Sequence, residues 1–346
     1  MISFKFQGAS HGEGYSGTIS GLPNGFTFDV DEVNKQLYER KRGLGRSERQ
    51  ALSDVVTFQG YDKTVTVNGD LHFFVANKCV ERRAEITALR SGHSDVVGKA
   101  RHPELSVRDV AEISSARNSV CYVVLGAICK QYLADRGIYT YHYVEKIGGI
   151  ASRNRYRFGV SEKEPHFNTL HCPCRYATGL MVEAIENARK TGNSLGGTVA
   201  VGATGVPMGL GEILPYTERL DAQIAANLVG IPSVKGITFG IGDKYAQLDG
   251  VSASDELTTQ NGQIAYATNK CGGIVAGITT GGDVLCHLTV KPIPTVKNVE
   301  TVDSVTKQKT PQHYERADVC VVPNVGVIAE NILAYVITNQ ILKQQK

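Results

Sequence analysis

The sequence predicts an α+β fold that forms a single domain over residues 1–346. Short alternating segments such as Ile2–Phe6 run into glycine-rich turns, as antiparallel strands do. Residues 106–137 and about 327–342 are predicted as long helices. No Ser/Pro-rich linker divides the chain, and no Gly-x-Gly-x-x-Gly motif follows a strand in a βαβ unit, so a Rossmann nucleotide site has no support.

Composition and charge exclude several classes of partner. The 346 residues are 42% hydrophobic, and 37 basic against 34 acidic residues leave a net charge of +3. So small a net charge provides no global field for nucleic acid or a membrane surface. The sequence has no apolar run of about eighteen residues and no signal-peptide pattern. We therefore expect a cytoplasmic protein without nucleic-acid or membrane partners.

The eight cysteines predict a reduced protein. Cys172-Pro173-Cys174 follows His171, but no second pair occurs at metal-ligand spacing, so no metal site is expected. Several others lie in apolar runs, where a free thiol acts as a small core residue: Cys121, Cys129, Cys271, Cys286 and Cys320.

The first strand leads into a loop of small residues around one histidine, Gly8–Gly14. With so little side-chain bulk, its backbone amides are able to face a ligand. Gly8-Ala9-Ser10-His11-Gly12 also matches the nucleophile elbow of hydrolases, Gly-x-Ser-x-Gly. That motif needs a following helix, whereas Gly14–Ile19 indicates a turn and a strand. We therefore do not expect Ser10 to be a nucleophile.

The other elements follow from turn and cap signals. Asn68-Gly69 and Asn261-Gly262 are strong type I′ hairpin signals, and Gly192 and Gly230 end two helices. In chain order we expect strands at 18–20, 26–28, 65–67, 71–75, 264–266, 284–290 and from 318, and helices from 29 past 37, 179–190, 219–228 and 327–342.

The longest helical pattern runs from Ser106, which forms a capping box with Asp109, to Gly137. It contains Ser114-Ser115-Ala116-Arg117, whose small hydroxyl groups and guanidinium suit the close approach of an anion or a flat cofactor. The alternative is that the small residues only let another helix pack closely. The predicted buried face consists of Val110, Ile113, Val120, Val124, Ala127, Ile128 and Leu133.

A short internal similarity relates two parts of the chain. Ser16–Gly21 and Gly196–Val201 each begin a series of strand, glycine turn, strand and helix. The pattern predicts two similar halves packed in one body. Chance similarity between glycine-rich strands is the alternative.

Arginines gather in two parts of the sequence, at 40–49 and around His93. Guanidinium groups are the usual partners of phosphate and carboxylate, so a small polyanionic metabolite is a candidate ligand. The alternative is a solvated helix end whose arginines pair with Glu39 and Glu48. After the strand at 284–290, two prolines stiffen Lys291–Thr295, and Asp318 is either a functional carboxylate or a turn-ending cap.

Taken together and in this order, these segments make the chain resemble the chorismate synthase family over nearly its whole length. The segments that carry the resemblance are 8–12; Arg40, Arg46 and Arg49; Arg90-Ser91-Gly92-His93-Ser94-Asp95; 114–117; 205–212; 231–236; 291–295; and 316–320.

The resemblance implies a β-α-β sandwich fold, usually assembled as a homotetramer, and a carbon-oxygen lyase of the shikimate pathway for aromatic amino acid biosynthesis. This lyase would release phosphate from 5-enolpyruvylshikimate-3-phosphate by anti-1,4-elimination to give chorismate. It would need reduced FMN without net redox change, and NADPH only if it reduces its own flavin. A divergent relative acting on another anionic ring, and a non-catalytic flavin- or anion-binding member, are the alternatives.

The resemblance also implies roles for individual residues. His11 would protonate the departing phosphate, His93 would serve the flavin N1 region, and Asp318 would act with flavin N5 in taking the proton. The substrate-binding residues implied are Arg40, Arg46, Arg49, Arg90 and Arg117, the first two also being assigned to NADPH in some members. The cofactor-binding residues implied are Ser114, Ser115, Ala116, Pro232, Ser233, Ala276, Lys291, Pro292, Ile293, Pro294, Thr295 and Arg316.

The chain departs from the family pattern at several positions. The family usually has Pro at Ser91 and Ala at Ser94, and it favours Gly at Ala276. The further departures are Ala9, Ile113, Ala317, Asn324, a loop missing around 62–70 and a short stretch before Arg90.

Overall fold

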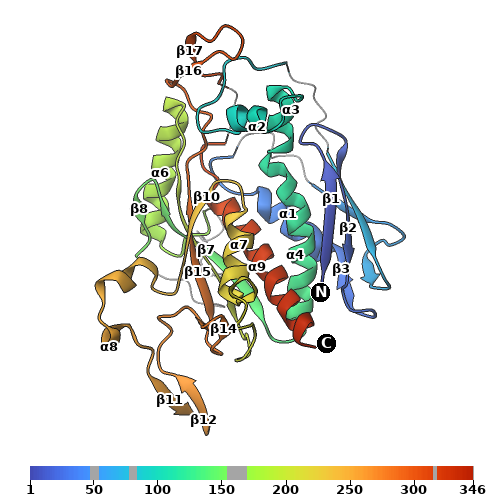
Figure 1. Cartoon of the computed structure of the whole chain (residues 1–346), viewed down its shortest axis with the longest axis vertical. Coiled ribbons are helices and arrows are strands. Elements are labelled where there is room, and N and C mark those ends of the chain that lie inside the picture. The colour runs from blue at the N-terminus through green and yellow to red at the C-terminus, as the bar shows by residue number, and fades with distance from the viewer. Residues whose placement is uncertain (47–53, 78–83, 154–169, 315–317, 346) are drawn as a thin grey trace.

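The computed structural model describes residues 1–46, 54–77, 84–153, 170–314 and 318–345. Two antiparallel sheets enclose a layer of helices (Figure 1). The first sheet has the order β1 (Ser3–Gly8), β2 (Gly14–Ser20), β6 (Leu71–Ala76) and β4 (Val56–Phe58). Its inward side chains pack on the helices. Phe4 and Phe6, for example, lie with ring centroids 5.7 and 5.4 Å from that of Tyr122.

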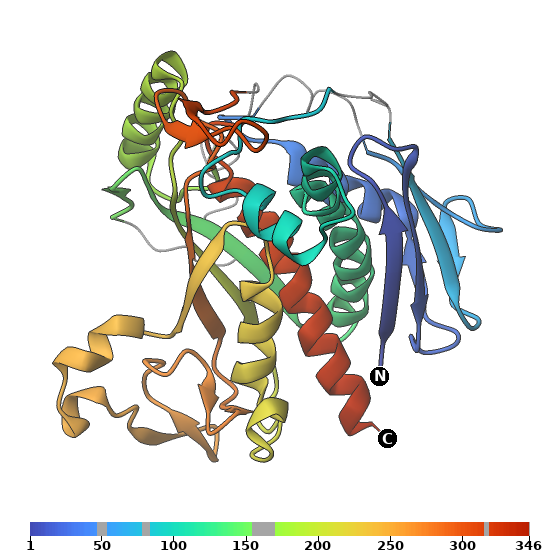
Figure 2. The ribbon, with the colours of Figure 1, turned by 45° about the horizontal axis from the view of Figure 1, so that its top comes forward.

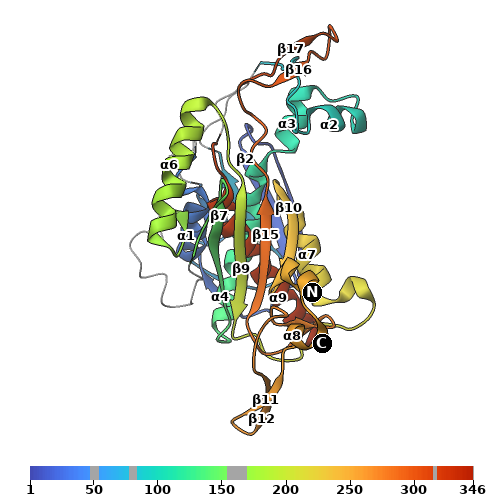
Figure 3. The ribbon, with the colours of Figure 1, turned by 90° about the vertical axis from the view of Figure 1, so that its left-hand side faces the viewer.

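The second sheet has five strands and is seen face-on in Figure 3. Its order is β10 (Val234–Phe239), β15 (Val284–Val290), β9 (Gly197–Thr204), β7 (Tyr139–Ile147) and β8 (Ile150–Ala151). β15 spans the residues that the sequence predicts. Since β9 pairs with both β7 and β15, it is the central strand, and its buried Val199 and Val201 contribute to the hydrophobic core.

Four helices fill the space between the sheets: α1 (Val30–Lys41), α4 (Ser119–Ala134), α7 (Leu220–Val229) and α9 (Val322–Gln344). α4 and α9 pack against each other across Gly126, where an added Cβ would lie 2.2 Å from the Asn331 carbonyl oxygen. One hydrophobic core extends from Ile2 to Leu342 through both sheets and these helices. This sheet-helix-sheet arrangement is the α+β sandwich that the resemblance implies (Figures 1 and 2).

α9 is long and apolar enough to cross a membrane by length and composition alone. Of its most apolar window, however, 89% is buried inside the fold, where the helix packs on β7, β9, α4 and α1. Burial on nearly every side explains why it is apolar all round. The helix begins before the predicted start at 327, with Pro323 in its first turn, so the strand predicted from Asp318 is wrong.

The single helix predicted over 106–137 is also wrong, because the chain breaks after Ile113. α3 (Val107–Ile113) ends at Ser114, a short 3-10 turn covers Ala116–Asn118, and α4 follows. Ser115 initiates the new turn, its hydroxyl accepting from the Arg117 amide at 3.3 Å. The predicted capping box at Ser106 is confirmed, but Ile113 is exposed instead of buried.

The two predicted hairpins differ in outcome. Asn261-Gly262 joins the paired strands β11 (Leu257–Gln260) and β12 (Gln263–Tyr266) with positive φ at both residues, as a type I′ turn requires. Asn68-Gly69 is not such a hairpin. The strand before it, β5 (Thr64–Thr66), pairs with β3 (Thr27–Asp29), and β6 after it pairs with β2 and β4, because the chain passes between sheets here.

The remaining predicted helices are present with shifted ends. α6 (Arg175–Thr191) ends at Gly192 in the left-handed conformation, and α7 ends at Gly230. Ser10 lies between the antiparallel strands β1 and β2, so no nucleophile elbow forms. The other elements are α2 (Asp95–Arg101), the 3-10 turns Tyr216–Glu218 and Gly242–Gln247, α8 (Gly250–Ala253), β13 (Ile274–Val275), β14 (Ile278–Thr279), β16 (Glu300–Val302) and β17 (Lys309–Pro311).

Candidate active site

His11 lies in the loop between β1 and β2, where a Gly12 amide bond to the Ala9 carbonyl closes a tight turn. Glu112 of α3 holds the histidine twice. One carboxylate oxygen accepts from the His11 amide at 2.9 Å, and the other contacts Nδ1 of the ring. This pairing makes Nδ1 the proton donor and fixes the orientation of the imidazole.

His93 has a similar partner on the other side of the helix break. Its Nδ1 lies 2.6 Å from Oδ1 of Asp95, the first residue of α2, which is fully buried. The guanidinium of Arg90 donates to both Asp95 oxygens, at 2.8 and 2.9 Å. Burial alone would raise the pKa of Asp95, but its bonds from His93 and Arg90 outweigh that effect and hold the pKa well below its usual range.

The break between α3 and α4 connects the two histidine loops. The Ser115 hydroxyl donates to that of Ser10 at 3.0 Å, next to His11. The Ser114 hydroxyl lies 2.6 Å from that of Ser94, which in turn is 3.1 Å from Nδ1 of His93. An unbroken helix would direct these two serines to different sides, so the break is what brings both loops to one place.

Next to this break, Asp54 collects cations from separate parts of the chain. Arg40 at the end of α1 donates to it at 2.7 Å, and Arg117 donates at 2.8 Å. Lys41 Nζ lies 3.7 Å away. Burial opposes ionisation of Asp54, yet Arg40, Arg117 and Lys41 together lower its pKa. The Asn324 amide of α9 fixes the end of α1 by donating to the Arg40 and Arg42 carbonyls at 2.8 and 2.6 Å.

Arg46 belongs to the same cluster and pairs with Asp318 at 2.7 Å. The two meet because the Val319 amide donates to the Gly45 carbonyl at 2.6 Å, and Gly45 has φ +93° with Cys320 in close contact. Nε of Arg40, Arg46 and Arg117 is buried in each case without a hydrogen-bond partner in the part of the chain that the structure describes. Such buried donors need an acceptor, and a bound oxyanion would provide it.

The loop at Lys291–Thr295 reaches the same end of the sandwich. Lys291 Nζ donates to the Gly92 carbonyl at 2.8 Å, beside His93, and its amide donates to the Ser233 carbonyl at 2.8 Å. Gln312 accepts from the Ser91 amide and donates to the Pro294 carbonyl, each at 2.8 Å. These contacts connect the loop to the His93 segment.

Comparison with known proteins decides the family of this chain. A model described as chorismate synthase matches residues 2–342. The chain belongs to the chorismate synthase family.

Individual relatives support this assignment over the full length. Chorismate synthases of Carboxydothermus hydrogenoformans and Moorella thermoacetica are 34% and 33% identical to the chain, each covering 99% of it and 94% of the relative. A chorismate synthase crystal structure superposes with a TM-score of 0.79 at 25% identity and covers 99% of this chain and 92% of that one. These similarities confirm the family resemblance and the α+β fold.

The structure does not bring every residue implied by the family resemblance to this site. Ala276, with φ +50°, lies in the turn between β13 and β14, at the end of β15 opposite to Lys291 (Figure 1). Arg90 is near His93, but its guanidinium is bound to Asp95. Arg49 and Arg316 lie outside the described residues.

The sequence did not predict Glu112, Asp54 or Lys41 as site residues. Glu112 is 101 positions from His11, and Asp54 is 63 positions from Arg117. No local signal predicts such pairings. The one available signal was the group of arginines itself, because buried arginines require carboxylates nearby.

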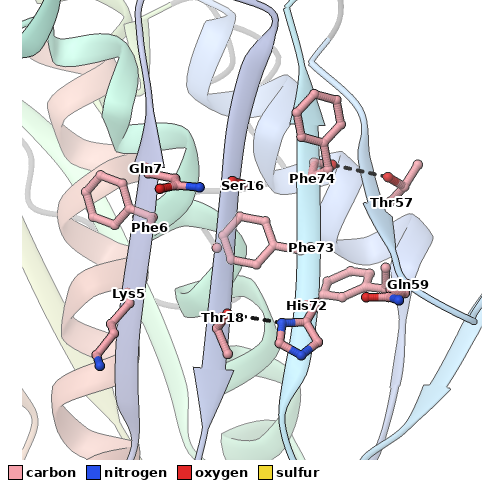
Figure 4. A pocket seen from close by; sticks show the side chains of 12 residues that line it. Lys5, Phe6, Gln7, Ser16, Thr18, Thr57, Gln59, His72, Phe73 and Phe74 are labelled. Atoms are coloured by element: carbon pink, nitrogen blue, oxygen red, sulfur yellow. Dashed lines mark hydrogen bonds between the residues drawn. The ribbon is translucent and has the colours of Figure 1, made fainter.

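Two other features lie apart from this site. The described residues contain no group of three or more His, Cys, Asp or Glu side chains placed to hold a metal ion. The outward face of the four-stranded sheet carries a hollow lined by residues such as Lys5, Thr18, His72 and Phe74 (Figure 4). This hollow is open and contains neither His11 nor His93, so it is not the candidate active site.

Proposed function

We propose that this chain is a chorismate synthase, a lyase that releases phosphate from 5-enolpyruvylshikimate-3-phosphate by anti-1,4-elimination to give chorismate. Family membership supports the proposal. The observation that carries it is the arginine cluster, in which three buried Nε atoms have no hydrogen-bond partner among the described residues, beside two histidines paired with carboxylates.

The cluster suits a substrate with one phosphate and two carboxylates. Arg40, Lys41, Arg46 and Arg117 bring four positive charges, and Asp54 and Asp318 bring two negative ones, so the cluster keeps a positive excess. Guanidinium groups held by buried carboxylates are fixed before the substrate arrives, so they bind it with little reorganisation. In our proposal they hold the phosphate and carboxylates.

The histidines and Asp318 would then handle protons. In a 1,4-elimination a C–H bond and the C–O bond to phosphate break at opposite ends of an allylic unit, and the electron pair of the C–H bond completes a diene. His11, oriented by Glu112, would give its proton to the departing phosphate oxygen. Asp318 would take the carbon-bound proton, and Asp95 would hold His93 so that Nε2 faces the ring region.

Reduced FMN, when bound, would supply electron density that loosens the C–O bond and would recover it afterwards. The residues that would hold it are Ser114, Ser115, Ala116, Pro232, Ser233 and Lys291–Thr295. Their fit rests on the Ser114 and Ser115 hydroxyls and the Lys291 ammonium, which gather at one end of the fold around the helix break. If the enzyme reduces its own flavin, NADPH would be the reductant, and Arg40 and Arg46 would contact it.

A single domain, a cytoplasmic location and a homotetramer complete the proposal. The homotetramer is also a candidate source of contacts for Ala276, since one chain places this residue away from Lys291.

The test is chorismate formation under anaerobic conditions with dithionite-reduced FMN. We expect turnover by the natural chain, and loss of turnover in His11→Ala and His93→Ala with the circular dichroism spectrum unchanged. Flavin binding without any product would indicate a divergent or inert relative of the family. Turnover in both variants equal to that of the unsubstituted enzyme would refute the assigned roles. NADPH in place of dithionite tests the reductase activity.

A further inference from the structure

Lys41, the last residue of α1, is a buried cation whose role the family resemblance does not explain. Its side chain is only 4% exposed. Among the described residues, its closest anionic atom is Oδ2 of Asp54, at 3.7 Å, which is beyond hydrogen-bond distance. A buried ammonium with one distant partner is costly, so its persistence calls for another partner.

Asp54 does not supply this partner, because its oxygens accept from Arg40 and Arg117 at 2.7 and 2.8 Å and lie too far from Lys41 Nζ for a hydrogen bond. Among the described residues, the charged groups around Lys41 are Asp54, the guanidinium groups of Arg40 and Arg117, and that of Arg46 in the following loop. Burial lowers the pKa of Lys41, Asp54 opposes this, and the three arginines add to the lowering, which brings the pKa to about 8.

We propose that Lys41 is a further substrate-binding residue, whose ammonium contacts an oxyanion held by Arg40, Arg46 and Arg117. The three buried Nε atoms without a partner in the described part of the chain belong to the same group of side chains and indicate where that oxyanion would lie. The identity of the substrate rests on the proposed function, whereas the oxyanion contact does not. A bound oxyanion stabilises the charged amine, so binding at high pH takes up a proton at Nζ.

The test is calorimetry of flavin-free protein in two buffers of different ionisation enthalpy. The pH is about 9, because most of the Lys41 amine is neutral at this pH before binding. The probes are inorganic phosphate and, separately, 5-enolpyruvylshikimate-3-phosphate, whose phosphates are already dianionic at this pH. We expect the natural chain to take up about one proton on binding. The heat difference between the buffers measures this uptake.

Three variants separate charge from titration. Lys41→Met is expected to bind about tenfold more weakly and without proton uptake. Lys41→Arg keeps its charge at this pH, so it should retain binding but lose the uptake. Lys35→Met is the matched control, because Lys35 is an exposed lysine on the same helix, paired with Glu32, and this variant should match the natural chain.

Each outcome has a distinct meaning. Phosphate binding with Lys41-dependent uptake supports the inference even if 5-enolpyruvylshikimate-3-phosphate does not bind, a result that would count against the proposed function instead. Equal uptake by the natural chain and Lys41→Arg overturns the inference even if the enzyme makes chorismate. Failure of both probes to bind the natural chain also overturns it.

Discussion

Each candidate catalytic histidine faces a carboxylate through Nδ1: His11 faces Glu112 and His93 faces Asp95. A carboxylate at this position sets the tautomer and holds the ring, as in other acid-base sites. The two carboxylates differ in their own support. Two hydrogen bonds from Arg90 fix Asp95, whereas Glu112 contacts both the backbone amide and the ring of His11.

Glu112→Gln should lower turnover by about 10²-fold while substrate binding changes little, because the amide is unable to stabilise the same protonated imidazole. The measurement is kcat with externally reduced FMN. Glu104→Gln is the control, since Glu104 is exposed on the connection before α3. Unchanged kcat in Glu112→Gln would mean that the pair is only structural.

Lys41→Met should stabilise the ligand-free protein by about 1–3 kcal/mol at neutral pH, because it removes a poorly paired buried cation. The folded-state pKa of about 8 lies below the ordinary value of 10.5. The unfolded chain therefore binds more protons between these two values, so the penalty is full below pH 8 and fades as pH rises toward 10.5. Thermal unfolding should thus show a larger gain in Tm at about pH 7 than at about pH 10; an equal gain would contradict this explanation.

At the scale of elements, the packing of α4 on α9 depends on a missing side chain. Gly126 faces the Asn331 backbone so closely that an added Cβ would lie 2.2 Å from the carbonyl oxygen and 2.5 Å from the carbonyl carbon. Neither atom is able to move without shifting α9, which also carries Asn324 against the end of α1. Packing at this contact therefore affects the position of Arg40.

Gly126→Ala should destabilise the fold by about 2 kcal/mol or more despite the higher helix propensity of alanine. Gly179→Ala in α6 is the matched control, because no atom lies within 4 Å of its added Cβ. This control should be neutral or slightly stabilising. The measurement is thermal unfolding of both variants. Equal Tm values for Gly126→Ala and Gly179→Ala would show that α4 and α9 separate readily.

At the scale of the whole molecule, a row of buried polar side chains joins the helix layer to the five-stranded sheet. Lys130 of α4 pairs with Glu330 of α9, which also pairs with Nδ1 of His142 on β7, and His142 contacts His171. Burial opposes ionisation of Glu330, but Lys130 and His142 outweigh it and lower its pKa to about 2. These side-chain contacts connect the helix layer to the five-stranded sheet.

Glu330→Gln should cost about 3–5 kcal/mol, because it leaves Lys130 without its buried partner. The folded-state pKa of Glu330 is depressed from 4.5, so its contribution is present above pH 4.5 and is lost as pH falls toward about 2. The natural chain should therefore lose more Tm across this window than Glu330→Gln does. Parallel pH profiles of the two proteins would contradict the assignment.

How much was predictable depends on the range of each interaction. Local signals succeeded where the cause is local: the Ser106 capping box, the Asn261-Gly262 turn and the Gly192 helix end are all confirmed. The Asn68-Gly69 hairpin failed although its signal was equally strong, because tertiary pairing sent the two flanking strands to different sheets.

The sequence by itself determined the α+β class, most elements and the family, since periodicity, caps and ordered motifs are written in neighbouring residues. Only the tertiary structure decided that the chain breaks at Ser114, that Glu112 holds His11, and that Asp54 gathers Arg40 and Arg117. These contacts join positions far apart in the chain, and their partners are selected by the cost of leaving buried charges unpaired, which no local pattern records.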